Sequence, residues 1–162
     1  MRQYYRRNKF NVPLTGNIQL RDPSFGTGDF DTNGDPIVDW KKFEADDSDE
    51  FGFYKDNVEN GGIYYLDISL PFGTMLARYG NEYGHYTAPI GTKYEELSLP
   101  YLEESVEYHE YRVIADSIVV RCEVRKGRVA PKFNCPGGGV QFYHLNGIIR
   151  QLIRNKILER VL

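Results

Sequence analysis

Short β-prone segments, closed by glycine or proline, dominate the second half of the chain and restrict the folds open to it. Residues 63–70, 108–114, 118–124 and 140–145 are rich in β-branched and aromatic side chains, a composition typical of strands. Residues 71–73 form the turn after the first segment, 127–131 read as a short strand or extended turn, and 78–100 as an ordered but irregular loop. Because no βαβ unit repeats, the pattern predicts a mostly antiparallel sheet.

A helical periodicity appears only at the C-terminal end. Apolar residues recur there at the spacing of one helix face, namely Ile148, Ile149, Leu152, Ile153, Ile157, Leu158, Val161 and Leu162. Asn146 is available as the N-cap, and the solvent-facing side carries Arg150, Arg154, Lys156 and Glu159. The sequence therefore predicts an α+β fold with a mostly antiparallel β-sheet core, a C-terminal amphipathic helix and a loop-rich N-terminal part.

The N-terminal part, residues 1–61, is rich in Gly, Asp, Asn and Pro, which predicts loops with short ordered pieces. Because 162 residues suit one domain, we expect a single domain over 1–162 with its core at 62–162. Asp29–Asp35 resembles half of a calcium loop, but Trp40 stands where a bidentate Glu is needed. A polar turn is therefore favoured, and the acidic stretch 44–50 reads as a solvated loop.

Charge and composition exclude several classes of protein. The net charge of −3 argues against general nucleic-acid binding, which needs a basic surface. No apolar run approaches the roughly 18 residues of a membrane span, and the polar, basic start at Met1–Lys9 predicts no signal peptide. Cys122 and Cys135 form no metal-ligand pair. They could form one disulfide bridge, and free thiols are favoured.

The common catalytic motifs are absent, so polar residues on strand faces are the first candidates for chemistry. There is no HExxH helix, G-x-S-x-G elbow, P-loop or G-x-G-x-x-G turn. Strand alternation places His109 on one face with Tyr111, and Gln141 on one face with Tyr143. An unpaired buried polar group costs about 1–3 kcal/mol, so each needs partners. Taken alone, each is more often a structural residue than a catalytic one.

Glycines and aromatic residues add weaker signals. Pro136 leads into the triplet Gly137, Gly138 and Gly139, directly before the segment of Gln141. Residues without Cβ allow a sharp turn or a close approach of a ligand to the backbone. The motifs at 78–80 (Arg-Tyr-Gly) and 84–86 (Gly-His-Tyr) place a cation near two tyrosines, which could hold a flat ring or simply belong to the core.

Taken together, these pieces resemble the tuberculosis-necrotizing-toxin type of NAD glycohydrolase domain. The string that carries the resemblance is Arg78-Tyr-Gly80, Gly84-His-Tyr86, Ala88-Pro-Ile-Gly-Thr-Lys-Tyr94, Ser98-Leu-Pro100, Tyr108-His109, Val129-Ala-Pro131 and Pro136-Gly-Gly-Gly-Val-Gln141. It covers about residue 62 to the end, with a looser match upstream at Trp40 and residues 52–53. The order and spacing of the pieces make the combination specific, although no single piece is.

The resemblance implies a small antiparallel α+β domain that splits NAD into nicotinamide and ADP-ribose without a metal or other cofactor. It implies that Arg78 holds the phosphate or ribose side, that the two tyrosines lie against the nicotinamide ring, and that turnover depends on His109 and Gln141. The implied catalytic residues are Arg78, Tyr86, His109 and Gln141, and the implied substrate-binding residues are Tyr79, Gly137, Gly138 and Gly139.

Two positions depart from that family's pattern. Leu97 stands where an Arg usually precedes Ser-Leu-Pro, and residues 132–135 read Lys-Phe-Asn-Cys where many members carry Trp-Phe and a polar residue. Loss of a bidentate phosphate ligand weakens binding unless another cation, such as Lys93 or Arg112, replaces it. The departures bear on substrate affinity more than on the fold.

The implied reaction needs no carboxylate pair. Ordinary glycosidases use two carboxylates, one of which protonates the leaving group, whereas the nicotinamide of NAD already carries a positive charge and leaves as a neutral molecule. Gln141 can hydrogen-bond a ribose hydroxyl or the attacking water, while His109 can orient the substrate or act as base. The sequence leaves these roles open.

Three functions follow from the resemblance. The first is an NAD(P) glycohydrolase, secreted or delivered as a toxin or effector that depletes NAD in the target-cell cytoplasm, with NAD+ or NADP+ as substrate and a cognate immunity protein as partner. The second is an ADP-ribosyl cyclase or transferase. The third is a degenerate nucleotide-binding or interaction module in which Leu97 has abolished turnover.

Overall fold

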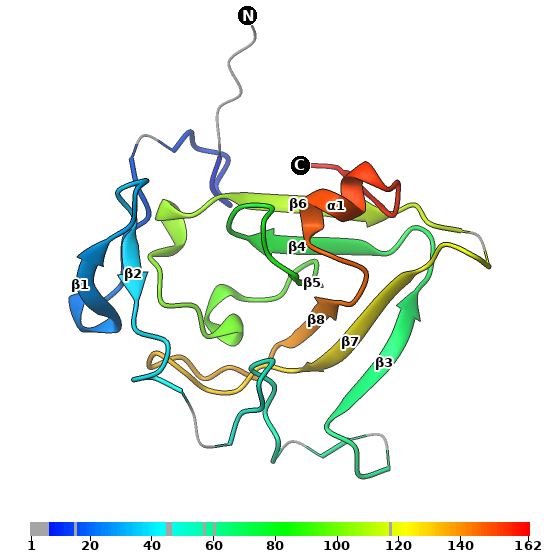
Figure 1. The fold of residues 1–162 in the computed structure, drawn as a ribbon, viewed down its shortest axis with the longest axis horizontal. Helices are drawn as coiled ribbons and strands as arrows, with labels where there is room; N and C mark the ends of the chain where they lie inside the picture. Colours follow the sequence, from blue (N-terminus) through cyan, green and yellow to red (C-terminus); the bar gives the residue numbers. More distant parts are fainter. Residues whose placement is uncertain (1–6, 15, 45–46, 57, 60, 117) are drawn as a thin grey trace, which may run out of the picture.

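The computed structural model describes residues 7–162 apart from 15, 45–46, 57, 60 and 117. Parts of two predicted segments, the basic start Met1–Lys9 and the acidic stretch 44–50, therefore lie outside the described residues. A seven-stranded sheet in the order β3-β7-β8-β5-β4-β6-β9 forms the body of the molecule, and a separate two-stranded sheet, β1-β2, lies at one end (Figure 1). Every strand pairing in both sheets is antiparallel, which confirms the predicted mostly antiparallel sheet.

Four strands arise where β-prone segments predict them. They are β3 (Tyr65–Leu70), β6 (Tyr108–Val113), β7 (Cys122–Arg128) and β8 (Val140–His144). Strand β7 begins later than the pattern 118–124 suggests and continues through Gly127, part of the separate short element predicted at 127–131. Glycine is required at this point because a Cβ atom would collide with the ring of Phe53.

The segment 78–100 is more regular than the prediction of an irregular loop. It contributes the end of β4 (Met75–Tyr79), all of β5 (Tyr86–Pro89) and the short 3-10 helix η2 (Tyr94–Leu97). The register pairs Leu76 with Pro89 and Ala77 with Ala88, and all but Pro89 of these four are buried. These strands are too short, and too rich in glycine and proline at their ends, to give a clear alternation.

The predicted C-terminal helix is present but shorter than the apolar pattern suggests. The helix α1 spans Ile149–Arg154 only, and β9 (Leu158–Arg160) follows it. Its N-cap is Ile148, whereas the side chain of Asn146 accepts a hydrogen bond from the Glu123 amide. The chain reverses at Lys156, which has a positive φ of 60°, and β9 then pairs with the free edge of β6. Backbone pairing at a sheet edge has replaced the last helical turns.

The main core lies between α1 and one face of the sheet. It contains Leu70, Leu76, Tyr111, Val113, Ala115, Cys122, Val124, Phe142, Ile149, Leu152, Ile157 and Leu158. Cys122 is buried in this core and Cys135 lies elsewhere, partly exposed. Both are free thiols, which confirms the favoured interpretation of the two cysteines.

The N-terminal part is mostly loop, as predicted, with 3-10 helix η1 (Pro23–Phe25) and strands β1 (Gly26–Phe30) and β2 (Pro36–Val38). The calcium-like motif is the turn between β1 and β2. The Asp31 carboxylate accepts hydrogen bonds from the amides of Asn33 and Asp35, which makes it a polar turn. Across the described ranges, no group of three or more His, Cys, Asp or Glu side chains could hold a metal ion.

The last 3-10 helix, η3 (Glu103–Ser105), precedes β6. Among the described residues, no helix has the length and apolar character needed to cross a membrane.

Candidate active site

A cleft lies on the face of the sheet opposite α1. Cross-strand partners share a face, and the register couples Ala77 to Ala88 and Tyr86 to Tyr143. Their strand neighbours Leu76 and Phe142 belong to the core under α1, so alternation places Ala77, Tyr86 and Gln141 on the other face. The sheet thus separates a face that holds the core from a face available for a ligand.

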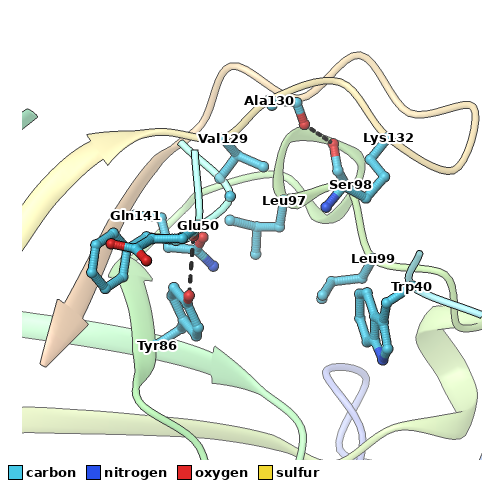
Figure 2. A pocket seen from close by; sticks show the side chains of 12 residues that line it. Trp40, Glu50, Tyr86, Leu97, Ser98, Leu99, Val129, Ala130, Lys132 and Gln141 are labelled. Atoms are coloured by element: carbon cyan, nitrogen blue, oxygen red, sulfur yellow. Dashed lines mark hydrogen bonds between the residues drawn. The ribbon is translucent and has the colours of Figure 1, made fainter. Parts of the chain in front are cut away.

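The cleft has two lobes that meet at a common waist. The first, which we name the Lys132 lobe, has a volume of about 320 Å³ and includes Lys132, Ser98 and Glu50 among its lining residues (Figure 2). The second, the Arg78 lobe, has about 340 Å³ and includes Arg78 and Tyr79. Five residues line both lobes: Trp40, Tyr86, Leu97, Leu99 and Gln141. Each lobe falls in the size range of small-molecule sites.

Gln141 is the least engaged polar group at the waist. It lies near the start of β8, partly buried, and pairs through its backbone with Gly127 of β7. Figure 2 shows its carboxamide between Tyr86 and Leu97, facing the cavity. Within the described part of the chain, this carboxamide makes no hydrogen bond, so both its donor and its acceptor are available to a ligand.

Tyr86 lies beside Gln141 on the same face of the sheet and is fixed in place. Its hydroxyl donates a hydrogen bond of 3.0 Å to the carbonyl oxygen of Phe51, which ties the 50–52 segment to β5. Burial raises the pKa of Tyr86 to about 12, so the hydroxyl keeps its proton at neutral pH. Tyr79 lines the Arg78 lobe, where its ring packs against Tyr94 at a centroid distance of 4.8 Å. Both predicted tyrosines therefore line the cleft.

Arg78 lies where β4 and β5 separate, at the end of its lobe. Its Nε donates to the carbonyl of Asn81 at 2.6 Å and its Nη1 to the carbonyl of Tyr86 at 2.9 Å. Gly84 is necessary beside it because a Cβ atom there would collide with the guanidinium. Burial lowers the pKa of Arg78, but a guanidinium remains charged in proteins. The side chain both organises the loop and presents charge at the cleft.

His109 is not brought into the cleft. It pairs with Arg78 across β6 and β4, on the face that carries Tyr111, and its ring lies 6.0 Å from the Tyr111 ring. It is near enough to Glu82 for its charge to lower the pKa of that carboxyl group. His109 is not among the described lining residues of either lobe. The structure therefore places His109 and Gln141 on opposite faces of the sheet. Arg78 shares the face of His109, but unlike His109 it is among the residues that line the cleft.

The glycine triplet, residues 137–139, lies next to the cleft in the chain but is not among the described lining residues of either lobe. Gly137 has a φ of 64°, and a Cβ atom there would lie 2.7 Å from the Val129 carbonyl oxygen. The amide of Gly139 donates to the carbonyl of Glu96 at 3.1 Å. Small residues are thus needed for a sharp turn that packs against η2 and leads into β8.

Several lining residues were given no role in the site by sequence reasoning, although some stand in the motifs quoted there. These are Trp40, Glu50, Phe51, Ser98, Leu99 and Lys132. They come from loops far apart in the chain, so no local spacing links them. Glu50 belongs to the stretch that we interpreted as a solvated acidic loop, and it is the one carboxylate that lines either lobe among the described lining residues.

The two cations suggested as replacements at position 97 lie elsewhere. Lys93 is exposed and lines neither lobe as described. Arg112 of β6 forms an ion pair with Glu159 of β9, at the β9 edge of the seven-stranded sheet. Neither residue therefore lies where it could take the place of an arginine at Leu97, and Lys132 is the cation that lines the lobe beside Leu97.

These features define a small, mostly antiparallel β-sheet domain with a two-lobed cleft whose waist combines a carboxamide and an aromatic hydroxyl. Residues 69–161 match the sequence family described as tuberculosis necrotizing toxin. The match takes in more than half of the chain, and the chain belongs to this family.

The chain is also similar to a curated protein and to a solved structure. The conidial surface nicotinamide adenine dinucleotide glycohydrolase nadA of Aspergillus fumigatus is 35% identical over 102 residues, which are 59% of this chain and 41% of that protein. The chain thus spans about two fifths of the length of this curated relative. The structure of tuberculosis necrotizing toxin complexed with its immunity factor IFT aligns with 86% of this chain and 79% of that chain, at 21% identity and a TM-score of 0.49.

Proposed function

We propose that this domain hydrolyses NAD+ or NADP+ at the bond between nicotinamide and ribose, releasing nicotinamide and the corresponding ADP-ribose. The observation that carries the proposal is the unengaged carboxamide of Gln141 at the waist of the cleft, beside Tyr86. Membership of the toxin family and similarity to an NAD glycohydrolase support the choice of substrate.

The proposed reaction needs no general acid from the protein. Nicotinamide leaves as a neutral molecule, so no side chain has to protonate it. The site has to hold the ribose, stabilise an oxocarbenium-like transition state and admit one water. Gln141 hydrogen-bonds a ribose hydroxyl or the attacking water, and the rings of Tyr79 and Tyr86 wall the space for the nicotinamide.

Two charged side chains assist in this proposal. The negative charge of Glu50, which lines the Lys132 lobe, favours the positive charge that develops on the ribose. Arg78 presents its guanidinium at the other end, where it holds a phosphate or ribose oxygen. Since the geometry keeps His109 away from the cleft, we assign it a positioning role through Arg78 and Glu82.

Product analysis tests the proposed function. Purified protein incubated with NAD+ and, separately, NADP+ is expected to release nicotinamide and linear ADP-ribose or its 2′-phosphate in equal amounts, measured by chromatography. A cyclic product would indicate the cyclase alternative, and ADP-ribose attached to protein the transferase alternative. Calorimetric binding of ADP-ribose without any product would indicate the degenerate nucleotide-binding module.

We propose that residues 1–162 act as one catalytic domain of a secreted or delivered effector that depletes NAD in the target-cell cytoplasm. A toxin of this kind needs a neutralising partner in the cell that makes it. A cognate immunity protein is therefore part of the proposal, and co-expression is expected to abolish NAD loss in a host cell.

A further inference from the structure

The segment that carries Lys132 is held rigidly beside the cleft. Ser98 Oγ donates to the carbonyl of Ala130 at 2.8 Å on one side, and Arg21 Nη2 donates to the carbonyl of Phe133 at 2.7 Å on the other. The turn closes when the amide of Cys135 donates to the carbonyl of Lys132 at 2.9 Å. A side chain on such a fixed backbone is suited to a positioned ligand contact.

The ammonium group of Lys132 enters the lobe that bears its name. Figure 2 shows its nitrogen beside Leu97 and Ser98, turned toward the cavity. The residue is half-buried, and this burial lowers the pKa of Lys132 against an opposing influence from Glu44. Within the described part of the chain, no carboxylate forms an ion pair with it. A partly desolvated cation without a paired anion favours an anionic ligand.

Charge is distributed along the cleft in a way that suits a dinucleotide. Lys132 is the one cation among the described lining residues of its lobe, and Arg78 is the one cation of the other lobe. Gln141 and Tyr86 line the waist between them. A ligand that reacts at the waist therefore meets a fixed positive charge on either side, while Leu97 offers the Lys132 lobe only apolar surface.

We propose that Lys132 binds a phosphate group of the dinucleotide substrate, either the pyrophosphate or the 2′-phosphate of NADP+, and so determines substrate affinity. This inference rests on the proposed function. Lysine binds phosphate as a point charge through its three N–H donors. The contact forms equally with substrate and product, because the phosphate does not react, so Lys132 contributes to binding and not to the chemical step.

Steady-state kinetics with NAD+ and NADP+ on Lys132→Met test the proposal, with Lys132→Arg as the conservative variant and Lys93→Met as the matched control. For Lys132→Met we expect KM to rise by about tenfold or more, the size of a lost charge-assisted hydrogen bond, with kcat within about twofold. We expect the arginine variant to restore most of the affinity and Lys93→Met to behave as wild type. Calorimetry with ADP-ribose, which keeps the pyrophosphate but lacks the 2′-phosphate, is expected to show the same loss of affinity for Lys132→Met where Lys132 binds the pyrophosphate, and no loss where it binds the 2′-phosphate.

The arms of the experiment separate the sources of the phosphate. A rise in KM for both substrates identifies the pyrophosphate, and a rise for NADP+ alone identifies the 2′-phosphate. Unchanged KM for both substrates in an active, folded Lys132→Met protein would overturn the role of Lys132 and leave the proposed function intact. A wild-type protein that neither turns over NAD+ nor binds ADP-ribose would overturn the proposed function itself.

Discussion

At the scale of single residues, His144 shows how a polar group is accommodated in the main core. Its side chain is 1% exposed, and its Nε2 lies 2.7 Å from the hydroxyl oxygen of Thr87, which is also buried. Cys122 Sγ lies 3.8 Å from its Nδ1. Burial, together with the nearby charges of Arg78 and His85, lowers the pKa of His144 from 6.5 to about 3. The folded protein therefore keeps this imidazole neutral.

We expect acid to destabilise the fold through His144. Because its pKa is lower in the folded state, the unfolded state binds the proton first, and stability falls as the pH drops from about 6.5 toward 3. The residue contributes up to about 1.4 kcal/mol per pH unit in that window. Urea unfolding at pH 7, 6 and 5 should give a shallower loss for His144→Gln than for wild type. Equal slopes for wild type and His144→Gln would refute this account.

At the scale of elements, α1 and β9 hold the β4–β5 loop that surrounds Arg78. The amides of Ile149 and Arg150 donate to the carbonyls of Gly84 and Glu82 at 2.9 Å each. The Glu82 carboxylate accepts from Tyr111 at 2.8 Å and from Arg160 of β9. Burial alone would raise the pKa of Glu82, but the hydrogen bonds from Arg160 and Tyr111 lower it overall. The C-terminal segment thus positions the Arg78 end of the cleft.

We expect Glu82→Gln to lower the free energy of unfolding by about 1–3 kcal/mol, since a mostly buried charged acceptor loses its match to Arg160. Loosening of the loop should also raise KM for NAD+, because Arg78 bonds to carbonyls of that loop. Glu159→Gln is the matched control: it breaks the exposed pair with Arg112 and should change stability by less than about 1 kcal/mol. Chemical denaturation and NAD+ kinetics give both values. Similar effects for the two variants would contradict the special role of Glu82.

At the scale of the whole molecule, one sheet serves two purposes. The face under α1 buries the main core, while the opposite face, with Tyr86 and Gln141, is left for a ligand. Loops from distant parts of the chain complete the second face, among them residues 50–52, 97–101 and Lys132. Mutations that disturb stability and mutations that disturb binding are therefore expected to lie on different faces of the same strands.

The sequence was most informative where one element decides the pattern. Strands such as β6 and β8 follow from β-branched and aromatic runs, and alternation along each strand was predicted correctly. Alternation does not say which face bears the cleft, so His109 and Gln141 were expected together although they lie on opposite faces. Conversely, Glu50 and Lys132 reach the cleft through loop closure, which leaves no periodic signal in the chain.

The C-terminal segment shows the limit of periodicity. Apolar spacing is the same whether residues continue a helix or reverse and enter a sheet. Ile157 and Leu158 are buried as predicted, but they reach the core from a turn and an edge strand, because β6 offered unpaired backbone groups. Only the position of β6 beside α1, a long-range feature, selects that outcome.

The most direct test of the central claim, that NAD+ is split at the waist of the cleft, is nicotinamide release by Gln141→Ala. Gln19→Ala, an exposed glutamine that lines neither lobe as described, is the matched control, and thermal unfolding verifies that both variants fold. We expect release to fall by about 100-fold or more in Gln141→Ala, as for loss of a donor that stabilises a transition state, and to stay unchanged in the control. Near wild-type release by a folded Gln141→Ala protein would contradict the claim.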